Sequence, residues 1–386
     1  MNYLTENGTL TIFPEGRIDS NNAPAVEREI TGIRDNNPAD SVVVDCEKLE
    51  YISSAGLRII LRLIKSVKNL KLINVCSDVY EIFDMTGFTE MTVIEKAYRR
   101  IDVEGCEVIG RGANGEVYRI NPDTIVKVYL NPDSLDDIRR ERELAKKAFV
   151  LGIPTAISYD VAKVGNGYGS VFELLNAKSF AQLIIEEPER FDELIGLYVD
   201  LLKKIHSTEV KPGDMPDMKE TALSWAKFTA GYLPEVTGAK LVRLISDIPQ
   251  SNKMLHGDYH LKNVMMQDGE ALLIDMDTLC VGDPVFEFGS IFNAYVGFHV
   301  LDHSGSYKFL GIPYDLTLKI WRSTLAKYFG TTDEKTLSEV EKKASIMGYT
   351  RLLRRTIRRY GETHESDFYK NELIKLVDTV DDLKVY

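Results

Sequence analysis

The octapeptide HGDYHLKN occupies residues 256–263, and the hexapeptide LLIDMD follows at residues 272–277. Together they supply Asp258 and Asn263 on one short loop and Asp275 at the end of an apolar run. In phosphoryl transfer, one carboxylate orients and deprotonates an attacking hydroxyl, while an amide oxygen and a second carboxylate hold Mg²⁺ against the phosphates. Such oxygen ligands suit Mg²⁺, which takes only one or two carboxylates besides substrate oxygens. The spacing therefore predicts phosphoryl transfer.

The pattern His-x-Asp-x-x-x-x-Asn followed by Ile-Asp-x-Asp resembles the catalytic loop and metal-binding Asp of the aminoglycoside phosphotransferase and choline kinase group. The resemblance implies a protein-kinase-like fold, ATP and Mg²⁺ as cofactors, and a small-molecule hydroxyl as acceptor. It makes Asp258 the base, and Asn263 and Asp275 the metal ligands, with Asp277 a further contributor. His256 is expected to brace the loop. The competing interpretation is a polar turn between two strands, in which Asp275 only caps.

Three glycines precede this region in GRGANGEV at residues 110–117. A dinucleotide-binding fingerprint needs a helix directly after Gly115, but the residues that follow alternate like a strand. Gly110, Gly112 and Gly115 therefore fit a kinase-type glycine-rich loop, whose bare backbone can approach phosphates closely.

Lys127 lies in the apolar strand predicted over residues 124–129, where a buried ammonium needs an anionic partner. The helix predicted over residues 134–150 offers two. Aligned on the family's Glu-Arg-Glu run, Glu143 is the better match for the ion pair with Lys127, and Glu141 is the alternate. Without this context both would be read as solvated helix charges.

The order of elements along the chain places a kinase hinge at Glu173 to Leu175, where backbone groups would hydrogen-bond adenine. From residue 179 the pattern is mostly helical. Glu287 stands where the family usually has an Asp that buttresses the catalytic loop. The long activation segment and the Ala-Pro-Glu with which protein kinases bind peptides are absent, which favours a small-molecule acceptor.

Strands and helices alternate over residues 1–98, which predicts a mixed sheet with crossover helices. The strand predicted at residues 41–45 is almost continuously apolar, as expected for a strand covered on both faces. The runs at residues 15–19, 45–57 and 83–88 resemble the STAS domain of anti-sigma factor antagonists. The resemblance implies a regulatory or partner-binding domain.

Ser54 falls on the position that is phosphorylated in STAS domains, although Ser53 replaces the usual preceding Asp. A phosphate there would be stabilised by a helix N-terminus. Two alternatives stay open: Ser53 or Ser54 is simply an N-cap, or only a binding surface remains.

Composition excludes several function classes. The 386-residue chain has a net charge of −12, which argues against nucleic-acid or anionic-membrane partners. Its four cysteines lack metal-ligand spacing, and neither a signal peptide nor an 18-residue apolar run is visible, so a cytoplasmic protein is expected. A basic helical stripe near the C-terminus is interpreted as a solvated face paired with Asp and Glu, with an anion-binding face as the alternative. The stripe comprises Arg351, Arg354, Arg355, Arg358 and Arg359.

The predicted fold is therefore of the α/β and α+β classes. A STAS-like mixed sheet with helices covers residues 1–98, a nucleotide-binding lobe covers 103–178, and a helical catalytic and substrate-binding lobe covers 179–386. Two other functions remain open: a signalling protein whose kinase-like domain senses nucleotide, and a kinase that phosphorylates a protein, such as Ser54 of a STAS domain.

Overall fold

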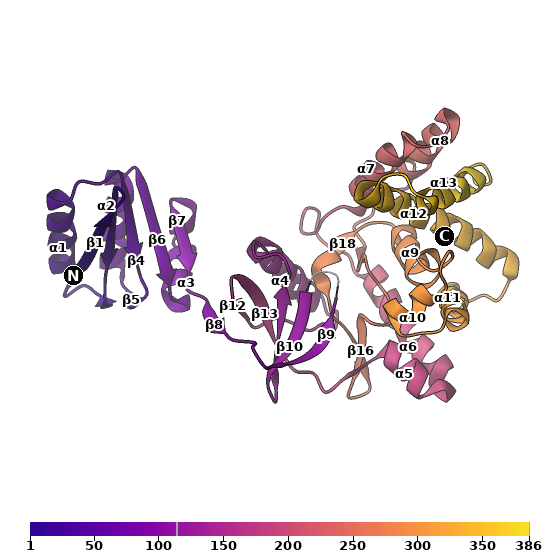
Figure 1. The fold of residues 1–386 in the computed structure, drawn as a ribbon, viewed down its shortest axis with the longest axis horizontal. Coiled ribbons are helices and arrows are strands. Elements are labelled where there is room, and N and C mark those ends of the chain that lie inside the picture. Colours follow the sequence, from indigo (N-terminus) through magenta and orange to yellow (C-terminus); the bar gives the residue numbers. More distant parts are fainter. Residues whose placement is uncertain (113–114, 386) are drawn as a thin grey trace. The chain divides into compact units, whose positions relative to one another are not determined.

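The computed structural model describes residues 1–112 and 115–385. The chain divides into two units, which are residues 1–105 with 161–169, and residues 106–160 with 170–386. Mixed sheets and helices make up both, so the predicted fold class is confirmed (Figure 1). Within the described ranges, no helix combines the length and the apolar character that crossing a membrane requires.

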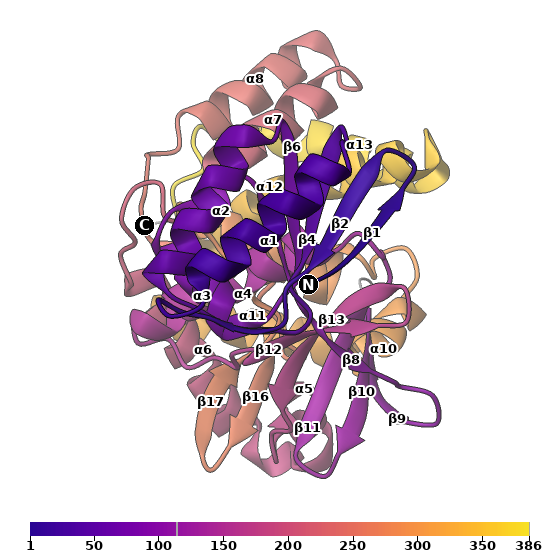
Figure 2. The ribbon, with the colours of Figure 1, turned by 90° about the vertical axis from the view of Figure 1, so that its left-hand side faces the viewer.

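A five-stranded sheet in the order β1-β2-β4-β6-β7 organises the N-terminal unit. β1 and β2 form an antiparallel hairpin, and the other neighbours pair in parallel. Figure 2 shows α1 and α2 running side by side across one face of this sheet. The strands are β1 (Asn2–Glu6), β2 (Thr9–Phe13), β4 (Ser41–Asp45), β6 (Asn69–Val75) and β7 (Val93–Lys96), with a parallel pair β3 (Gly16–Ile18) and β5 (Leu49–Ile52), and the helices are α1 (Ala23–Asn36), α2 (Ser54–Ser66), α3 (Ser77–Met85) and the 3₁₀ turn η1 (Phe88–Glu90).

The core of this unit lies between the sheet and the helices. Val42 and Val44 on β4 are buried with the other inward side chains, whereas Val43 is only partly covered. The prediction that β4 is covered on both faces was therefore wrong, because the helices cover one face. The unit also contains a short parallel pair between β8 (Arg99–Ile101) and part of β12 (Asp160–Val164).

The second unit begins with a sheet in which β10 pairs antiparallel with β9 and β11, and β13 adjoins β11. α4 follows β11 and carries one buried face. These elements are β9 (Glu107–Arg111), β10 (Gly115–Asn121), β11 (Thr124–Tyr129), α4 (Leu135–Val150) and β13 (Gly167–Glu173).

The rest of this unit is mostly helical, with short strands on either side of the loop at residues 256–263. α12 packs along α9 and α7, and Asn293 Nδ2 donates to Gly348 O at 3.1 Å where the helices meet. The helices are α5 (Phe180–Glu186), η2 (Pro188–Arg190), α6 (Phe191–Ser207), α7 (Met218–Ala230), α8 (Glu235–Ser246), η3 (Met276–Thr278), α9 (Pro284–Phe292), the π-helical η4 (Asn293–Gly297), α10 (Ser304–Leu310), α11 (Tyr314–Phe329), α12 (Glu334–Tyr360) and α13 (His364–Val377), and the strands are β14 (Lys178–Ser179), β15 (Met254–Leu255), β16 (Val264–Gln267), β17 (Glu270–Leu273) and β18 (Cys280–Val281).

Gly56 in the first turn of α2 packs directly against the β3–β5 pair. A Cβ at this position would lie 2.6 Å from Ile52 Cγ1 and 2.8 Å from Ile18 Cγ2. Both isoleucines are fully buried, so neither side chain can move away. The close approach of α2 to the β3–β5 pair therefore requires a residue without a side chain at position 56.

We expect Gly56→Ala to lower the free energy of unfolding of the N-terminal unit by about 1–3 kcal/mol, because the added methyl overpacks the core. The measurement is amide hydrogen exchange over residues 54–66. Gly32→Ala in α1 is the matched control, since a Cβ there meets nothing within 4 Å. It should stabilise its helix by about 0.5–1 kcal/mol. Equal protection of α2 in both variants would contradict the packing argument.

Candidate active site

Lys127 on β11 connects three elements through its ammonium group. Nζ lies 3.0 and 3.2 Å from the two carboxylate oxygens of Glu141 on α4 and 2.6 Å from Asp275 Oδ1. Its side chain is only 16% exposed. Burial alone would lower the pKa of Lys127, but the charges of Glu141 and then Asp275 outweigh burial and hold the pKa above its ordinary value. Lys127 is therefore a fixed cation.

The prediction that Glu143 pairs with Lys127 was wrong, and the alternate Glu141 is the partner. Glu141 shares the buried face of α4 with Ile138 and Ala145, at helical spacing, whereas Glu143 points to solvent. Sequence reasoning also missed Tyr129, whose hydroxyl donates to Glu141. The sequence could have indicated Tyr129, because it lies two residues after Lys127 and residues two apart on a strand share a face.

The catalytic loop brings Asp258 and Asn263 together, as their spacing predicted. Asn263 Nδ2 donates to Asp258 O at 3.0 Å, and Asn263 N donates to His260 O at 2.9 Å. His260 Nε2 lies 3.5 Å from Asp258 Oδ2. Burial opposes ionisation of Asp258, but the hydrogen bond and charge of His260, with Arg351 and His256, lower the pKa of Asp258 to about 2. The carboxylate is therefore ionised at neutral pH, with 40% of its side chain exposed.

Glu287 in the first turn of α9 fixes the backbone of the loop at residues 256–263. Its carboxylate is fully buried and accepts the backbone N–H groups of His256 and Gly257. His256 Nε2 lies 3.3 Å from Ile274 O, so the ring links the loop to the segment that carries Asp275. Gly257 has φ of +83°, and a Cβ there would lie 2.4 Å from Thr278 O. The loop conformation therefore requires glycine.

The oxygen atoms beside Lys127 fit a magnesium ion bound with phosphates. Because Asn263 Nδ2 donates a hydrogen bond to Asp258 O, the side-chain oxygen Oδ1 of Asn263 is the atom that can bind the metal ion. Asp275 adopts a left-handed backbone conformation, with φ of 63°, and its side chain is 41% exposed. Burial, and then the charges of Asp275 and Glu141, raise the pKa of Asp277 to about 7. This crowding of carboxylates favours a cation.

The described residues form no group of three His, Cys, Asp or Glu placed to hold a metal by themselves. This result is compatible with Mg²⁺, because that ion completes its coordination with water and phosphate oxygens. Asn263 and Asp275 lie close together because Ile274 N donates to Asn263 O at 3.0 Å, at the open end of the β16–β17 hairpin.

The predicted glycine-rich loop lies between β9 and β10. Gly110 is in β9, Gly115 opens β10, and Gly112 N donates to Gly115 O at 2.9 Å. Residues 113–114 of the predicted loop lie outside the described residues. At the predicted hinge, Glu173 is the exposed last residue of β13, Leu175 is half-buried, and Leu174 N donates to Asp123 O at 2.7 Å.

Ser54 is the exposed first residue of α2, and the cap of this helix is Ser53, whose Oγ accepts from Gly56 N at 3.5 Å. Of the two alternatives for a cap, Ser53 is therefore the one observed. The Ser54 hydroxyl is left at the helix N-terminus, where an added phosphate is favoured.

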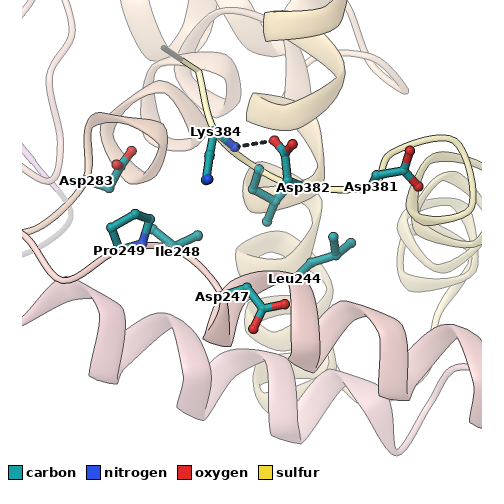
Figure 3. Close-up of a pocket in the computed structure, with 9 residues that line it drawn as sticks. Leu244, Asp247, Ile248, Pro249, Asp283, Asp381, Asp382 and Lys384 are labelled. Carbon is teal, nitrogen blue, oxygen red and sulfur yellow. Dashed lines mark hydrogen bonds between the residues drawn. The ribbon is translucent and has the colours of Figure 1, made fainter.

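The described residues of the second unit line at least two cavities. One of about 430 Å³ adjoins the Lys127–Glu141 pair, and the other, of about 240 Å³, shares no residue with it (Figure 3). In Figure 3, Asp283 and Lys384 face the second cavity from separate segments. The first is lined by Tyr129, Leu130, Asn131, Ser134, Asp137, Arg140, Glu141 and Asp277, and the second by Leu244, Asp247, Ile248, Pro249, Asp283, Asp381, Asp382, Leu383 and Lys384.

We expect Glu287→Gln to lower the free energy of unfolding of the second unit by about 1.5–3 kcal/mol, because a neutral amide replaces a charged acceptor of two buried N–H groups. Urea unfolding followed by tryptophan fluorescence measures this unit alone, since Trp225 and Trp321 both lie in it. Glu143→Gln, at an exposed position, should change stability by less than about 0.5 kcal/mol. Equal urea midpoints of unfolding for the two variants would contradict the proposed stabilising role of Glu287.

Comparisons with known proteins identify the families of the two parts of the chain. The family model described as the phosphotransferase enzyme family matches residues 105–302, and that of the STAS domain matches residues 1–102. A putative anti-sigma factor antagonist, BtrV of Bordetella bronchiseptica, is 34% identical over 85 residues, which cover 21% of this chain and 72% of the relative.

Two solved structures of thermostable mutants of aminoglycoside phosphotransferase APH(4)-Ia show the same fold. The apo form has a TM-score of 0.50 at 11% identity and covers 71% of this chain and 94% of its own. The ternary complex with ADP and hygromycin B has a TM-score of 0.50 at 12% identity and covers 72% and 95%. Both resemblances predicted from the sequence are thus confirmed. Because the first family model spans just over half of the chain, the protein belongs to the phosphotransferase enzyme family and carries a STAS domain at its N-terminal end.

Proposed function

We propose that the protein transfers the γ-phosphoryl group of ATP to a hydroxyl of a small molecule. The observation that carries this proposal is the joining of Lys127 to Asp275, at 2.6 Å, next to a loop that holds Asp258 and Asn263. A fixed cation, an ionised carboxylate and two oxygen ligands are the groups that phosphoryl transfer uses. Family membership supports the reaction class.

In this reaction Asp258 accepts a hydrogen bond from the acceptor hydroxyl and takes its proton as the oxygen attacks the γ-phosphorus. The bond between that phosphorus and the bridging oxygen breaks, and ADP leaves. Lys127 binds the α- and β-phosphates and is kept in place by Glu141. Mg²⁺, when bound, neutralises charge that develops on the phosphate oxygens. Asn263 and Asp275 would hold it, with Asp277 adjacent.

A small acceptor is favoured by the short path of the chain after Asp275. The residues that follow form η3 and β18 and enter α9 at Pro284. Protein kinases use a long segment at this place to bind peptides. We further propose that the STAS domain binds a partner or regulates the kinase-like part.

A protein acceptor is the second candidate, and one observation favours it. Ser54 is exposed, and its hydroxyl is not needed for the helix cap because Ser53 makes that bond. Intact-mass analysis after incubation with ATP and Mg²⁺ distinguishes the two. A phosphate that is added to the wild type but not to Ser54→Ala would favour the protein acceptor.

We expect Asp258→Ala to reduce acceptor-dependent ATP turnover by about 10²–10⁴-fold, the usual contribution of a positioned base, while ATP binding is retained. The measurement is ADP release with Mg²⁺ and pooled hydroxyl-bearing metabolites and aminoglycosides. Asp268→Asn, at an exposed hairpin turn, is the control and should keep full turnover. Turnover in Asp258→Ala equal to the wild type would exclude the proposed mechanism.

Glu141→Gln should weaken the binding of Mg-ATP by about 10-fold or more, because Lys127 loses the charged partner on α4 that keeps it in place and retains only Asp275. Glu143→Gln is the matched control on the same helix, and its affinity should stay within about 2-fold of the wild type because exposed charges contribute little. Isothermal titration calorimetry measures both. The reverse order of effects would restore Glu143 as the partner and contradict the assignment.

A further inference from the structure

The arginine stripe of α12 begins at the catalytic loop. Arg351 Nη1 donates to Gly257 O at 3.2 Å and to Ser290 Oγ at 2.9 Å. Gly257 directly precedes Asp258, whose pKa Arg351 helps to lower. Arg354 and Arg355 follow at helical spacing, so they continue the same face. The stripe therefore extends from the position of the proposed base along α12.

No arginine of this stripe forms an ion pair within 4.0 Å with a carboxylate in the described ranges 1–112 and 115–385. The predicted pairing with Asp and Glu was therefore wrong, whereas Arg355, Arg358 and Arg359 are exposed, as predicted for a solvated face. The guanidinium groups instead lie over aromatic rings. Arg351 and Arg354 are 5.6 and 5.9 Å from the Trp225 ring, and Arg355 is 5.0 Å from the Phe298 ring.

Five arginines lie within residues 351–359 of a chain with a net charge of −12. Burial, and then the charge of Arg358, lower the pKa of Arg354. Like charges held this close repel one another, and an anion would relieve the repulsion. Guanidinium groups also present donors in a planar fork that matches the oxygens of carboxylate and phosphate.

A series of packed ring side chains also lies between Asp258 and Arg355. His260 lies against Asp258 and packs on Phe309, with ring centroids 5.2 Å apart. Phe309 packs on Phe298 at 6.0 Å, and Arg355 lies over Phe298. His260 and the two phenylalanines thus form one continuous set of packed side chains between Asp258 and Arg355.

We propose that the phosphoryl acceptor carries an anionic group, a phosphate or a carboxylate, which binds Arg354 and Arg355 while its hydroxyl lies at Asp258. This assignment of the acceptor class rests on the function proposed above. Arg351 acts as a positioning residue, because it holds the backbone next to the base. A polycationic acceptor would face the same guanidinium groups without a counter-charge, so this proposal disfavours that class.

Trp225 reports directly on this site, since two of its arginines lie over its ring, while Trp321 is only 1% exposed. The experiment titrates inorganic phosphate, and separately acetate, into the full chain with Mg²⁺ and a saturating non-hydrolysable ATP analogue that fills the nucleotide site. Ionic strength is held constant with chloride. We expect a saturable change in tryptophan fluorescence, with phosphate and acetate distinguishing the two anion types.

The variant Arg354→Gln combined with Arg355→Gln should weaken this binding by about 10-fold or more. Arg359→Gln is the matched control, because Arg359 lies over the ring of Tyr360 and should leave the affinity unchanged. Fluorescence that does not saturate with either anion, or equal affinity in both variants, would overturn the proposal. Asp258→Asn should keep phosphate binding while it loses turnover, which separates this proposal from the proposed function.

Turnover then assigns the acceptor class. Acceptors are compared in three groups of matched size, which are anionic, neutral and cationic, with kanamycin among the last. We expect turnover with the anionic group, and a KM raised by about 10-fold in the double arginine variant with kcat nearly unchanged. A neutral or cationic acceptor whose KM is the same in that variant would overturn the inference. Anion binding without any turnover would instead remove the proposed function, and the acceptor assignment with it.

Discussion

The buried charge of Lys127 constrains the whole second unit. A buried ammonium is unfavourable unless carboxylates pair with it, and here the two partners come from separate parts of the fold, Glu141 on α4 and Asp275 beyond the β16–β17 hairpin. These two ion pairs therefore connect β11 both to α4 and to the segment that follows β17. Glu141 is the more deeply buried of the two carboxylates, and it also accepts a hydrogen bond from the Tyr129 hydroxyl.

The catalytic loop is held by a second polar cluster that is buried more deeply. Glu287 accepts two backbone N–H groups, and Ser290 and Arg351 both donate to the carbonyl of Gly257. Backbone groups in a buried turn need such partners, because no water is available to them. The result is that Asp258 projects from a rigid backbone, with part of its side chain exposed, where it can contact an acceptor.

Charge is distributed unevenly over this acidic chain. Carboxylates gather around Lys127, where Asp277 has a raised pKa, and arginines gather on α12 beside Asp258. The first concentration suits a metal ion with a nucleotide, and the second suits an anionic group of the acceptor.

The sequence alone determined the alternating pattern of the STAS domain and the family, because both depend on local spacing and on residue type. It also predicted that Asp258 and Asn263 share one loop and that Lys127 needs an anionic partner. Only the tertiary structure decided between Glu141 and Glu143, and between Ser53 and Ser54 as the cap, because each choice depends on which face of a helix is buried or on one backbone angle. It also brought Arg351 to Gly257 across a long stretch of chain. Spacing cannot reveal such a contact, because the packing of α12 against α9 creates it.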